Sequence, residues 1–331
     1  MNVRMPDSAS PPVATEPRLR IALVDLARGI ALLAMFVFHF AYDLSYFGLI
    51  ETDVPQDPAW RLFARTIAAS FLTLVGISLV LATRGRLNRA AYLKRLAMVS
   101  GAAALVTIGT WFAMPNSFIF FGILHQVALA SVLALPFLRL PVALVATVAA
   151  IVFALPYLVH APIFEARWLL WLGLAQDVPN TADFVPVLPW FGWALVGTVV
   201  ARLALPRLAG SRIAAWRPGS RLSRLIAWGG RHSLLVYLLH QPIFIGSLML
   251  AMPLLAAPPS EDRSFMNSCQ RSCAANAVGA DACEKLCTCT VDALKAEDLW
   301  SKAIANALAT AEATRVSEIA RSCTIRFTPR P

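Results

Sequence analysis

The chain has 331 residues, of which 58% are hydrophobic, and its mean hydropathy is +0.64. Soluble domains contain roughly 45–50% apolar residues, so this composition excludes a water-soluble globular protein. The formal net charge of +10 would suit nucleic-acid binding, but the basic residues lie in short blocks between long apolar runs. We therefore expect the chain to have a lipid bilayer as its partner and no nucleic acid.

Seven apolar stretches are long enough, at roughly 20 residues each, to cross a hydrocarbon core of about 30 Å. They must be helices, because lipid offers backbone amides no hydrogen-bond partners. The stretches are 21–41, 62–82, 96–114, 117–137, 140–160, 186–206 and 232–253. The predicted fold class is therefore all-α, a polytopic transmembrane helical bundle of about seven spans. Segment 161–175 is apolar enough to lie in the interface or re-enter, which leaves the number of spans open by one.

The composition also predicts three regions along the chain. Residues 1–17 are polar and Pro-rich, and we expect a disordered cytoplasmic N-terminus there. The transmembrane domain then covers residues 18–256. Residues 257–331 have mixed charges and helical periodicity, which predicts a small helical domain of different character.

The charges between the spans predict the orientation. Five basic residues lie between spans two and three, and the loop between spans six and seven contains Arg207, Arg212, Arg217, Arg221 and Arg224. The positive-inside rule makes both loops cytoplasmic. Loops 42–61 and 161–185 are acidic and fall on the other side, so the two sets of loops agree. The C-terminal domain is then periplasmic or extracellular, and the Arg/Ala/Pro-rich composition favours a bacterial inner membrane.

All six cysteines lie in the C-terminal region, where an oxidising compartment allows disulfides. They are Cys269, Cys273, Cys283, Cys287, Cys289 and Cys323. Each Cys-x3-Cys pair places two sulfurs one helical turn apart, so two antiparallel helices can be joined in a ladder. This favours pairing Cys269 with Cys287, Cys273 with Cys283, and Cys289 with Cys323, although six cysteines allow fifteen connectivities. The metal alternative is weaker because this region has no histidine, and we predict no metal.

The first span carries four ionisable residues, which is abnormal for a helix that faces lipid. At 100° per residue, Asp25, Arg28, His39 and Asp43 fall on one stripe about 60° wide. Each ionisable group at membrane depth costs about 2.5–3.5 kcal/mol, so such a set normally faces the bundle interior or a cavity. Asp25 and Arg28 lie near the cytoplasmic end, where they are either a gate or a structural ion pair.

His39 and Asp43 are the predicted catalytic residues. Their i,i+4 spacing allows the carboxylate to accept a hydrogen bond from one imidazole nitrogen, which leaves the other nitrogen as a general base. The alternative is a buried histidine bonded to a nearby carbonyl. Other polar residues inside spans are Arg65, His125, Gln126, Tyr237, His240 and Gln241. Of these, Arg65, His125, Tyr237 and His240 are candidate substrate contacts. Each one alone is more often a satisfied core residue, but their convergence favours a shared polar cavity.

Four separated motifs resemble the heparan-alpha-glucosaminide N-acetyltransferase catalytic-domain family, formerly a domain of unknown function, within the wider membrane acyltransferases. They are Arg20-x4-Asp25-x2-Arg28-Gly29-Ile30-Ala31 with Met35 and His39; Phe71 to Leu79; Asp183 to Gly192; and Gly230-Arg231-His232-Ser233-Leu234 with Tyr237, His240, Gln241 and Pro242. The resemblance covers about residues 18–250, in order. The cysteine region lies outside it.

The resemblance implies a membrane acyltransferase that takes an acetyl or other acyl group from acyl-CoA, most simply acetyl-CoA as donor substrate. The acceptor would be an amine or hydroxyl of an extracytoplasmic saccharide or glycolipid. Basic residues of the second cytoplasmic loop would attract the phosphates of coenzyme A: Arg84, Arg86, Arg89, Lys94 and Arg95. His39 departs from the lysosomal members, which have Asn at the matching position, and the chain is shorter than they are.

Two other classes remain as alternatives. A transporter or lipid-carrier flippase also needs a polar path through the membrane, but it typically has broken helices or repeated halves, and the sequence contains no internal repeat. A non-catalytic anchor for the cysteine domain would leave the buried ionisable residues without a purpose. The sequence leaves a homodimer open as an assembly.

Overall fold

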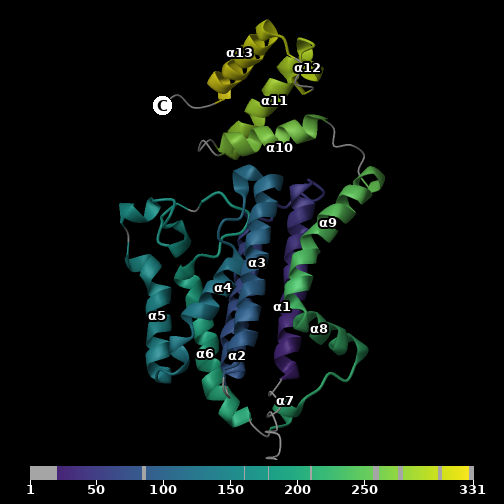
Figure 1. Ribbon diagram of the computed structural model, residues 1–331. Helices are drawn as coiled ribbons and strands as arrows, with labels where there is room; N and C mark the ends of the chain where they lie inside the picture. The colour runs from purple at the N-terminus through teal and green to yellow at the C-terminus, as the bar shows by residue number, and fades with distance from the viewer. Residues whose placement is uncertain are drawn as a thin grey trace, which may run out of the picture. The chain divides into compact units, whose positions relative to one another are not determined.

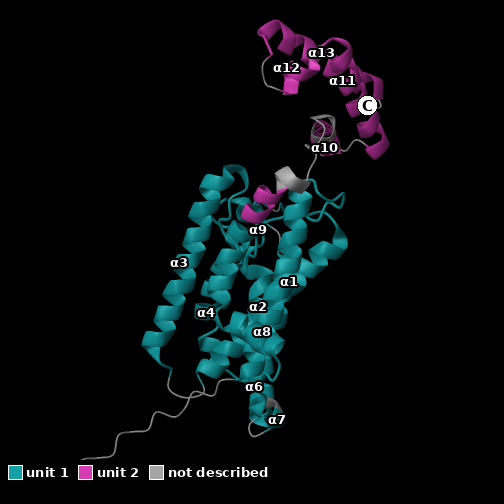
Figure 2. Cartoon of the chain, turned by 90° about the vertical axis from the view of Figure 1, so that its right-hand side faces the viewer, with its two compact units in different colours: residues 1–245 teal, residues 246–331 magenta. Residues whose placement is uncertain are grey.

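The computed structural model describes residues 21–83, 87–159, 161–177, 179–208, 211–255, 261–274, 279–304 and 308–327. The described chain is all-helical, with 79% helix and no strand, which confirms the predicted fold class (Figure 1). It divides into two compact units, residues 1–245 and 246–331 (Figure 2). Each unit is described by itself.

Nine α-helices belong wholly or partly to the first unit among the residues described. They are α1 (Ala22–Tyr46), α2 (Pro58–Ala82), α3 (Arg89–Ala113), α4 (Ile123–Leu133), α5 (Val142–Leu158), α6 (Val187–Leu208), α7 (Arg212–Ala215), α8 (Arg221–Arg231) and α9 (Ser233–Leu255). Within the described chain, α1, α2, α3, α6 and α9 are long and apolar enough to cross a membrane. These five helices occupy five of the seven predicted spans.

The two other predicted spans contain shorter apolar helices. Helix α5 has 17 residues and a length of about 25 Å, whereas α4 has 11 residues and a length of about 16 Å. The prediction of one continuous helix over 117–137 is wrong. Residues 118–122 are non-helical, and Phe121 forms a β-bridge with Phe184. Helix α4 begins at Ile123 after the N-cap residue Gly122, and the Ile123 amide in its first turn donates to Asp183.

Helix α2 packs on α1 and α6, and α5 packs on α6 (Figure 1). The largest apolar core of the unit lies among α4, α5 and α6 and includes the buried residues Ala130, Val145 and Leu195. At the crossing of α2 with α6, a Cβ atom on Gly197 would lie 2.0 Å from the carbonyl oxygen of Thr73. Close backbone contact through small residues is the usual way that helices associate in lipid.

The segment between α6 and α9, which the sequence indicated only as a basic loop, contains α7 and α8. Helix α8 packs on α1, and the two backbones touch through glycines (Figure 1). A Cβ atom on Gly29 would lie 2.0 Å from the Ile226 carbonyl oxygen, and one on Gly230 would lie 1.8 Å from the Asp25 carbonyl oxygen. The first and last motifs of the family resemblance therefore meet in space, although about 200 residues separate them.

The second unit contains α10 (Glu261–Ala274), α11 (Ala280–Ala296), α12 (Trp300–Ile304) and α13 (Thr310–Phe327). Its core consists of Val291, Leu294, Leu299, Trp300 and Ile319. Three disulfides join Cys269 to Cys287, Cys273 to Cys283, and Cys289 to Cys323, which confirms the predicted pairing. The first two link α10 to α11 as a ladder, and the third links α11 to α13.

Candidate functional site

The polar stripe of α1 faces the protein interior. Asp25 and Asp43 are 7% and 3% exposed, and His39 is half-buried. The predicted inward orientation of this stripe is therefore confirmed. The stripe does not meet a single set of partners, because its two ends contact different helices.

The end of the stripe nearer the N-terminus of α1 forms an ion pair. Arg28 Nη1 lies 3.2 Å from Asp25 Oδ1. Arg28 Nη2 donates to Ser78 Oγ on α2, and the Ser78 hydroxyl donates to the Leu74 carbonyl. The guanidinium thus ties α1 to α2, as the structural interpretation of Asp25 and Arg28 requires. Sequence reasoning missed Ser78, although a serine inside an apolar span was a signal for it.

The other end of the stripe meets α9 in a cluster of aromatic rings. The ring centroids of His39 and His240 lie 4.8 Å apart, with the edge of one ring toward the other. Phe36 stacks on His240 at 5.7 Å, and Phe244 meets it edge-on at 6.0 Å. The Tyr237 ring lies 5.4 Å from His240 on the same helix. Two histidines from opposite ends of the family resemblance are therefore neighbours.

Asp43 has a different partner from the one predicted. Gln241 Nε2 donates to Asp43 Oδ1 at 3.1 Å. Asp43 Oδ2 has no hydrogen-bond partner among the described residues, so the predicted His39–Asp43 hydrogen bond is absent. The i,i+4 spacing allowed that bond, but the side-chain amide of Gln241 on α9 donates a hydrogen bond to the carboxylate instead. Gln241 was noticed in the sequence as a polar residue inside a span, yet nothing there connected it to Asp43.

His240 has a defined tautomer. Its Nδ1 atom contacts the Tyr237 carbonyl oxygen, which can only accept a hydrogen bond, so we assign the proton to Nδ1. In the neutral ring, Nε2 then carries a lone pair. His240 is 5% exposed, and no described residue is a hydrogen-bond partner of Nε2.

The cluster leaves three buried atoms without partners in the described part of the chain: Asp43 Oδ2, Gln241 Oε1 and His240 Nε2. Gln241 must turn its NH2 group toward the carboxylate, so Oε1 is an acceptor. All three are therefore hydrogen-bond acceptors. Leaving such an atom buried and unpaired costs about 1–3 kcal/mol. Buried unpaired acceptors are typical of a site in which a ligand supplies the hydrogen-bond donors.

Gln126 on α4 is a separate case. It is fully buried, and neither its Oε1 nor its Nε2 atom has a partner within the described chain. No ring contact or hydrogen bond of the described residues joins it to His240 or Asp43. Gln126 was noticed in the sequence among the polar residues inside spans but was not assigned a role.

His125, a predicted substrate contact, is already bonded at both ring nitrogens. The Gly122 amide donates to Nδ1 at 3.3 Å. The other nitrogen, Nε2, lies 3.2 Å from Thr107 Oγ1, whose own hydrogen goes to the Ile119 carbonyl. His125 therefore closes the N-terminus of α4 and fastens it to α3, so the structure favours a structural role for it.

Four of the predicted cationic contacts lie at exposed positions among the described residues. Arg65 is exposed on α2 and forms no ion pair or hydrogen bond with another described residue, so the structure does not bring it into the cluster. Arg89, Lys94 and Arg95 are exposed in the first two turns of α3. Arg84 and Arg86 lie outside the described residues. The three described residues leave a basic surface at this end of α3.

Asp183, in the loop before α6, was part of a quoted motif but had no predicted role. Its Oδ2 atom accepts from the Ile123 amide at 2.7 Å, and a Cβ atom on Gly122 would collide with the carboxylate. Burial raises the pKa of Asp183 to about 6, while the hydrogen bond from Ile123 opposes the shift. The residue holds the loop against the start of α4.

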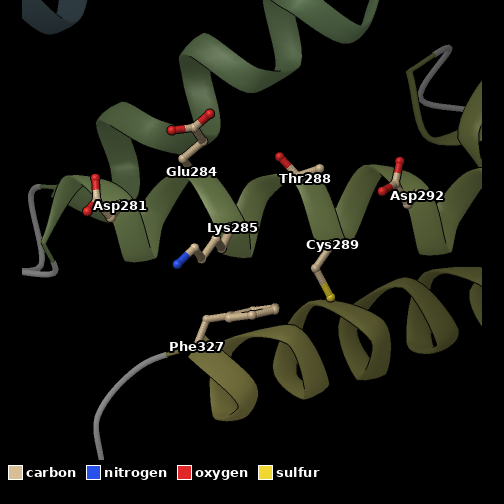
Figure 3. Close-up of a pocket in the computed structure, with 7 residues that line it drawn as sticks. All are labelled: Asp281, Glu284, Lys285, Thr288, Cys289, Asp292 and Phe327. Carbon is tan, nitrogen blue, oxygen red and sulfur yellow. The ribbon is translucent and has the colours of Figure 1, made fainter.

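The second unit has a shallow groove of about 510 Å³ along α11 (Figure 3). Glu284, Thr288 and Asp292 point away from α13 in this view, while Cys289 points toward α13 and Phe327 lies below Lys285. The groove thus wraps around an exposed flank of one helix. Apart from Cys289 it contains no predicted site residue. Among the described residues, no group of three His, Cys, Asp or Glu side chains is placed to hold a metal ion.

A described chain that is all-helical and has several membrane-length apolar helices indicates an integral membrane protein. The profile described as "Heparan-alpha-glucosaminide N-acetyltransferase, catalytic" matches residues 20–242, and the chain belongs to this family. The match includes every residue of the α1–α9 cluster except Phe244. Comparisons with curated proteins and with solved structures give no match. Family membership indicates a membrane acetyltransferase.

Proposed function

We propose that this protein transfers an acetyl group from acetyl-CoA to an amine or hydroxyl of an extracytoplasmic saccharide or glycolipid. One observation supports the proposal above the others: the His39 and His240 rings lie 4.8 Å apart, beside a buried carboxylate, in a chain of this acetyltransferase family. Acyl transfer to an amine or hydroxyl needs a base that removes a proton from the nucleophile. A histidine pair at membrane depth supplies that chemistry.

The donor would approach from the cytoplasmic side. Arg89, Lys94 and Arg95 present positive charge at one end of α3, and Arg84 and Arg86 precede them in the sequence. Phosphates of coenzyme A are attracted to such a surface. The charge pattern of the loops supports an orientation with the N-terminus in the cytoplasm of a bacterial inner membrane. The histidine cluster would then lie toward the outer side, where a saccharide arrives.

Each residue of the cluster has a proposed role. One histidine of the His39–His240 pair is the base, and His39 is the choice that the sequence favours. Asp43, held by Gln241, binds the acceptor rather than orienting His39, because its second oxygen is unpartnered within the described chain. Tyr237 fixes His240 through its carbonyl. Asp25 and Arg28 form a structural pair, and Arg65 stays a candidate contact for an anionic group.

Purified protein incubated with radiolabelled acetyl-CoA and glucosamine tests the proposal. We expect label to appear in the sugar and free thiol to appear in equal amount. His39→Ala removes one ring of the pair and should lower transfer at least tenfold, whereas His232→Ala, an exposed histidine outside the cluster, should not. Transport of the sugar without a covalent change would instead indicate the transporter alternative, and transfer by His39→Ala at the wild-type rate would exclude His39 from the chemistry.

A further inference from the structure

We infer that His240 Nε2, rather than His39, is the atom that takes the proton from the attacking group, and that Asp43 and Gln241 accept the other hydrogens of the sugar, from the amine and from a neighbouring hydroxyl. The inference rests on the proposed acetyl transfer and goes one step further, because it assigns the base and the acceptor contacts to named atoms. It starts from the hydrogen bonds of α9 rather than from sequence spacing.

A general base must present a lone pair, and only a fixed tautomer presents it at a fixed place. His240 Nδ1 donates to the Tyr237 carbonyl, which leaves the lone pair at Nε2. This nitrogen is buried and has no partner in the described chain. The Tyr237 backbone carbonyl thus fixes the tautomer of His240, as the Asp43 carboxylate was expected to fix the tautomer of His39.

The aromatic neighbours keep the His240 ring in this orientation. Phe36 stacks on it with an interplanar angle of 20°, and Phe244 stands at 89° to it. The His39 ring meets it at 61°. Because these rings restrict rotation about the side-chain bonds, Nε2 keeps its direction without a carboxylate partner.

His39 lacks a comparable constraint. Its ring contacts are with Phe38 and His240, and none of the hydrogen bonds recorded for the described residues fixes its tautomer. Asp43, the predicted orienter, is bonded to Gln241 through Oδ1. We therefore assign His39 as a positioning residue that packs against the base.

The two other unpartnered acceptors match the needs of the nucleophile. A neutral amine that gives one hydrogen to His240 Nε2 has one more hydrogen to place, and the hydroxyls of the sugar carry others. Asp43 Oδ2 and Gln241 Oε1 are acceptors on the adjoining side chains. A carbonyl-bearing group cannot satisfy these atoms, because it offers no donor. The cluster therefore suits the acceptor substrate rather than the acetyl oxygen of the donor.

The transfer balances with these assignments. The neutral amine attacks the thioester carbonyl carbon, so a C–N bond forms and the C–S bond breaks. The proton that the amine loses passes to His240 Nε2. The same proton then passes to the sulfur of the departing thiolate, which leaves as free coenzyme A, and His240 returns to its neutral form. The products are the N-acetyl sugar and the thiol, and no other reactant is needed.

His240→Asn is the matched test, because the amide nitrogen of Asn takes the place of Nδ1 and can still donate to the Tyr237 carbonyl, while Nε2 is removed. With acetyl-CoA and glucosamine we expect kcat to fall at least about 100-fold, within the range known for loss of a general base. KM for acetyl-CoA should change less than about threefold. His39→Asn should lower kcat about tenfold, and His232→Asn should leave it unchanged.

A second nucleophile separates a base from a structural residue. Hydroxylamine is unprotonated and strongly nucleophilic at neutral pH, so its reaction depends little on a base. We expect His240→Asn to lose less than about tenfold with hydroxylamine while it loses about 100-fold with glucosamine. Equal losses with both nucleophiles would mean that the substitution damages the fold, and they would overturn the assignment.

Should His240→Asn not fold, His240→Gln places an amide near the Nε2 position and is expected to give the same selectivity for hydroxylamine. If the wild type transfers acetyl but His39→Asn lowers kcat more than His240→Asn does, this inference is overturned and the proposed function still stands. No transfer by the wild type to any amine or hydroxyl sugar would overturn both.

Discussion

The two ends of the α1 stripe differ in how far their polar groups are satisfied. At one end, Arg28 bonds both Asp25 and Ser78. At the other end, Asp43, His240 and Gln241 each keep a buried acceptor atom without a partner among the described residues. Fully bonded polar groups fasten helices, whereas unpaired buried acceptors cost stability unless a ligand pairs them. The comparison teaches that residues on one face of one helix can serve packing at one end and chemistry at the other.

The largest effect is expected at Asp43. In Asp43→Asn the amide oxygen faces the Gln241 NH2 group, so the new NH2 stands where Oδ2 was and turns an acceptor into a donor. We expect transfer to glucosamine to fall about 100-fold, while thermal unfolding in detergent changes little. Asp53→Asn removes an equal charge from the exposed loop after α1 and should keep wild-type activity. Wild-type transfer by Asp43→Asn would contradict an acceptor role for this carboxylate.

At Arg28 we expect a loss of stability without a large loss of activity, the reverse of the expectation for Asp43. Arg28→Gln shortens the side chain and removes the charge that faces Asp25 and Ser78, so we expect a loss of about 1–3 kcal/mol in unfolding free energy. Thermal unfolding in detergent measures this loss. Activity per folded molecule should stay within about twofold of wild type if the pair only fastens α1 to α2. A large loss of kcat with unchanged stability would instead favour the gate interpretation.

A smaller, pH-dependent effect is expected at Asp183, whose carboxylate has a structural partner as Asp25 does. Burial raises its pKa from 3.8 to about 6, so the folded state favours the protonated form. The stability that this group contributes is full below about pH 4 and is lost as the pH rises through about 6. Unfolding temperatures of the wild type should therefore fall relative to Asp183→Asn between pH 4.5 and pH 7. A constant difference across that range would contradict the raised pKa.

Hydropathy and helical spacing were sufficient to predict the structure where the interacting groups are close in the sequence. The apolar runs predicted membrane helices, and the one-turn spacing of cysteines favoured a pairing that the structure confirms. They were insufficient at residues 118–122, which are non-helical and where the first amide of α4 donates to Asp183, 60 residues away. They also suggested a hydrogen bond within α1 from His39 to Asp43. The structure instead has a hydrogen bond from Gln241 on α9 to Asp43.

The sequence by itself determined that this is a membrane protein and that the charged face of α1 turns inward, because burial cost and helical periodicity act within one segment. It favoured the cysteine pairing for the same reason but did not determine it. Only the tertiary structure decided that His39 meets His240 and that Asp43 binds Gln241, about 200 residues away in the chain. The reason is that helical spacing says which residues share a face. Which other helix covers that face depends on the packing of the whole bundle.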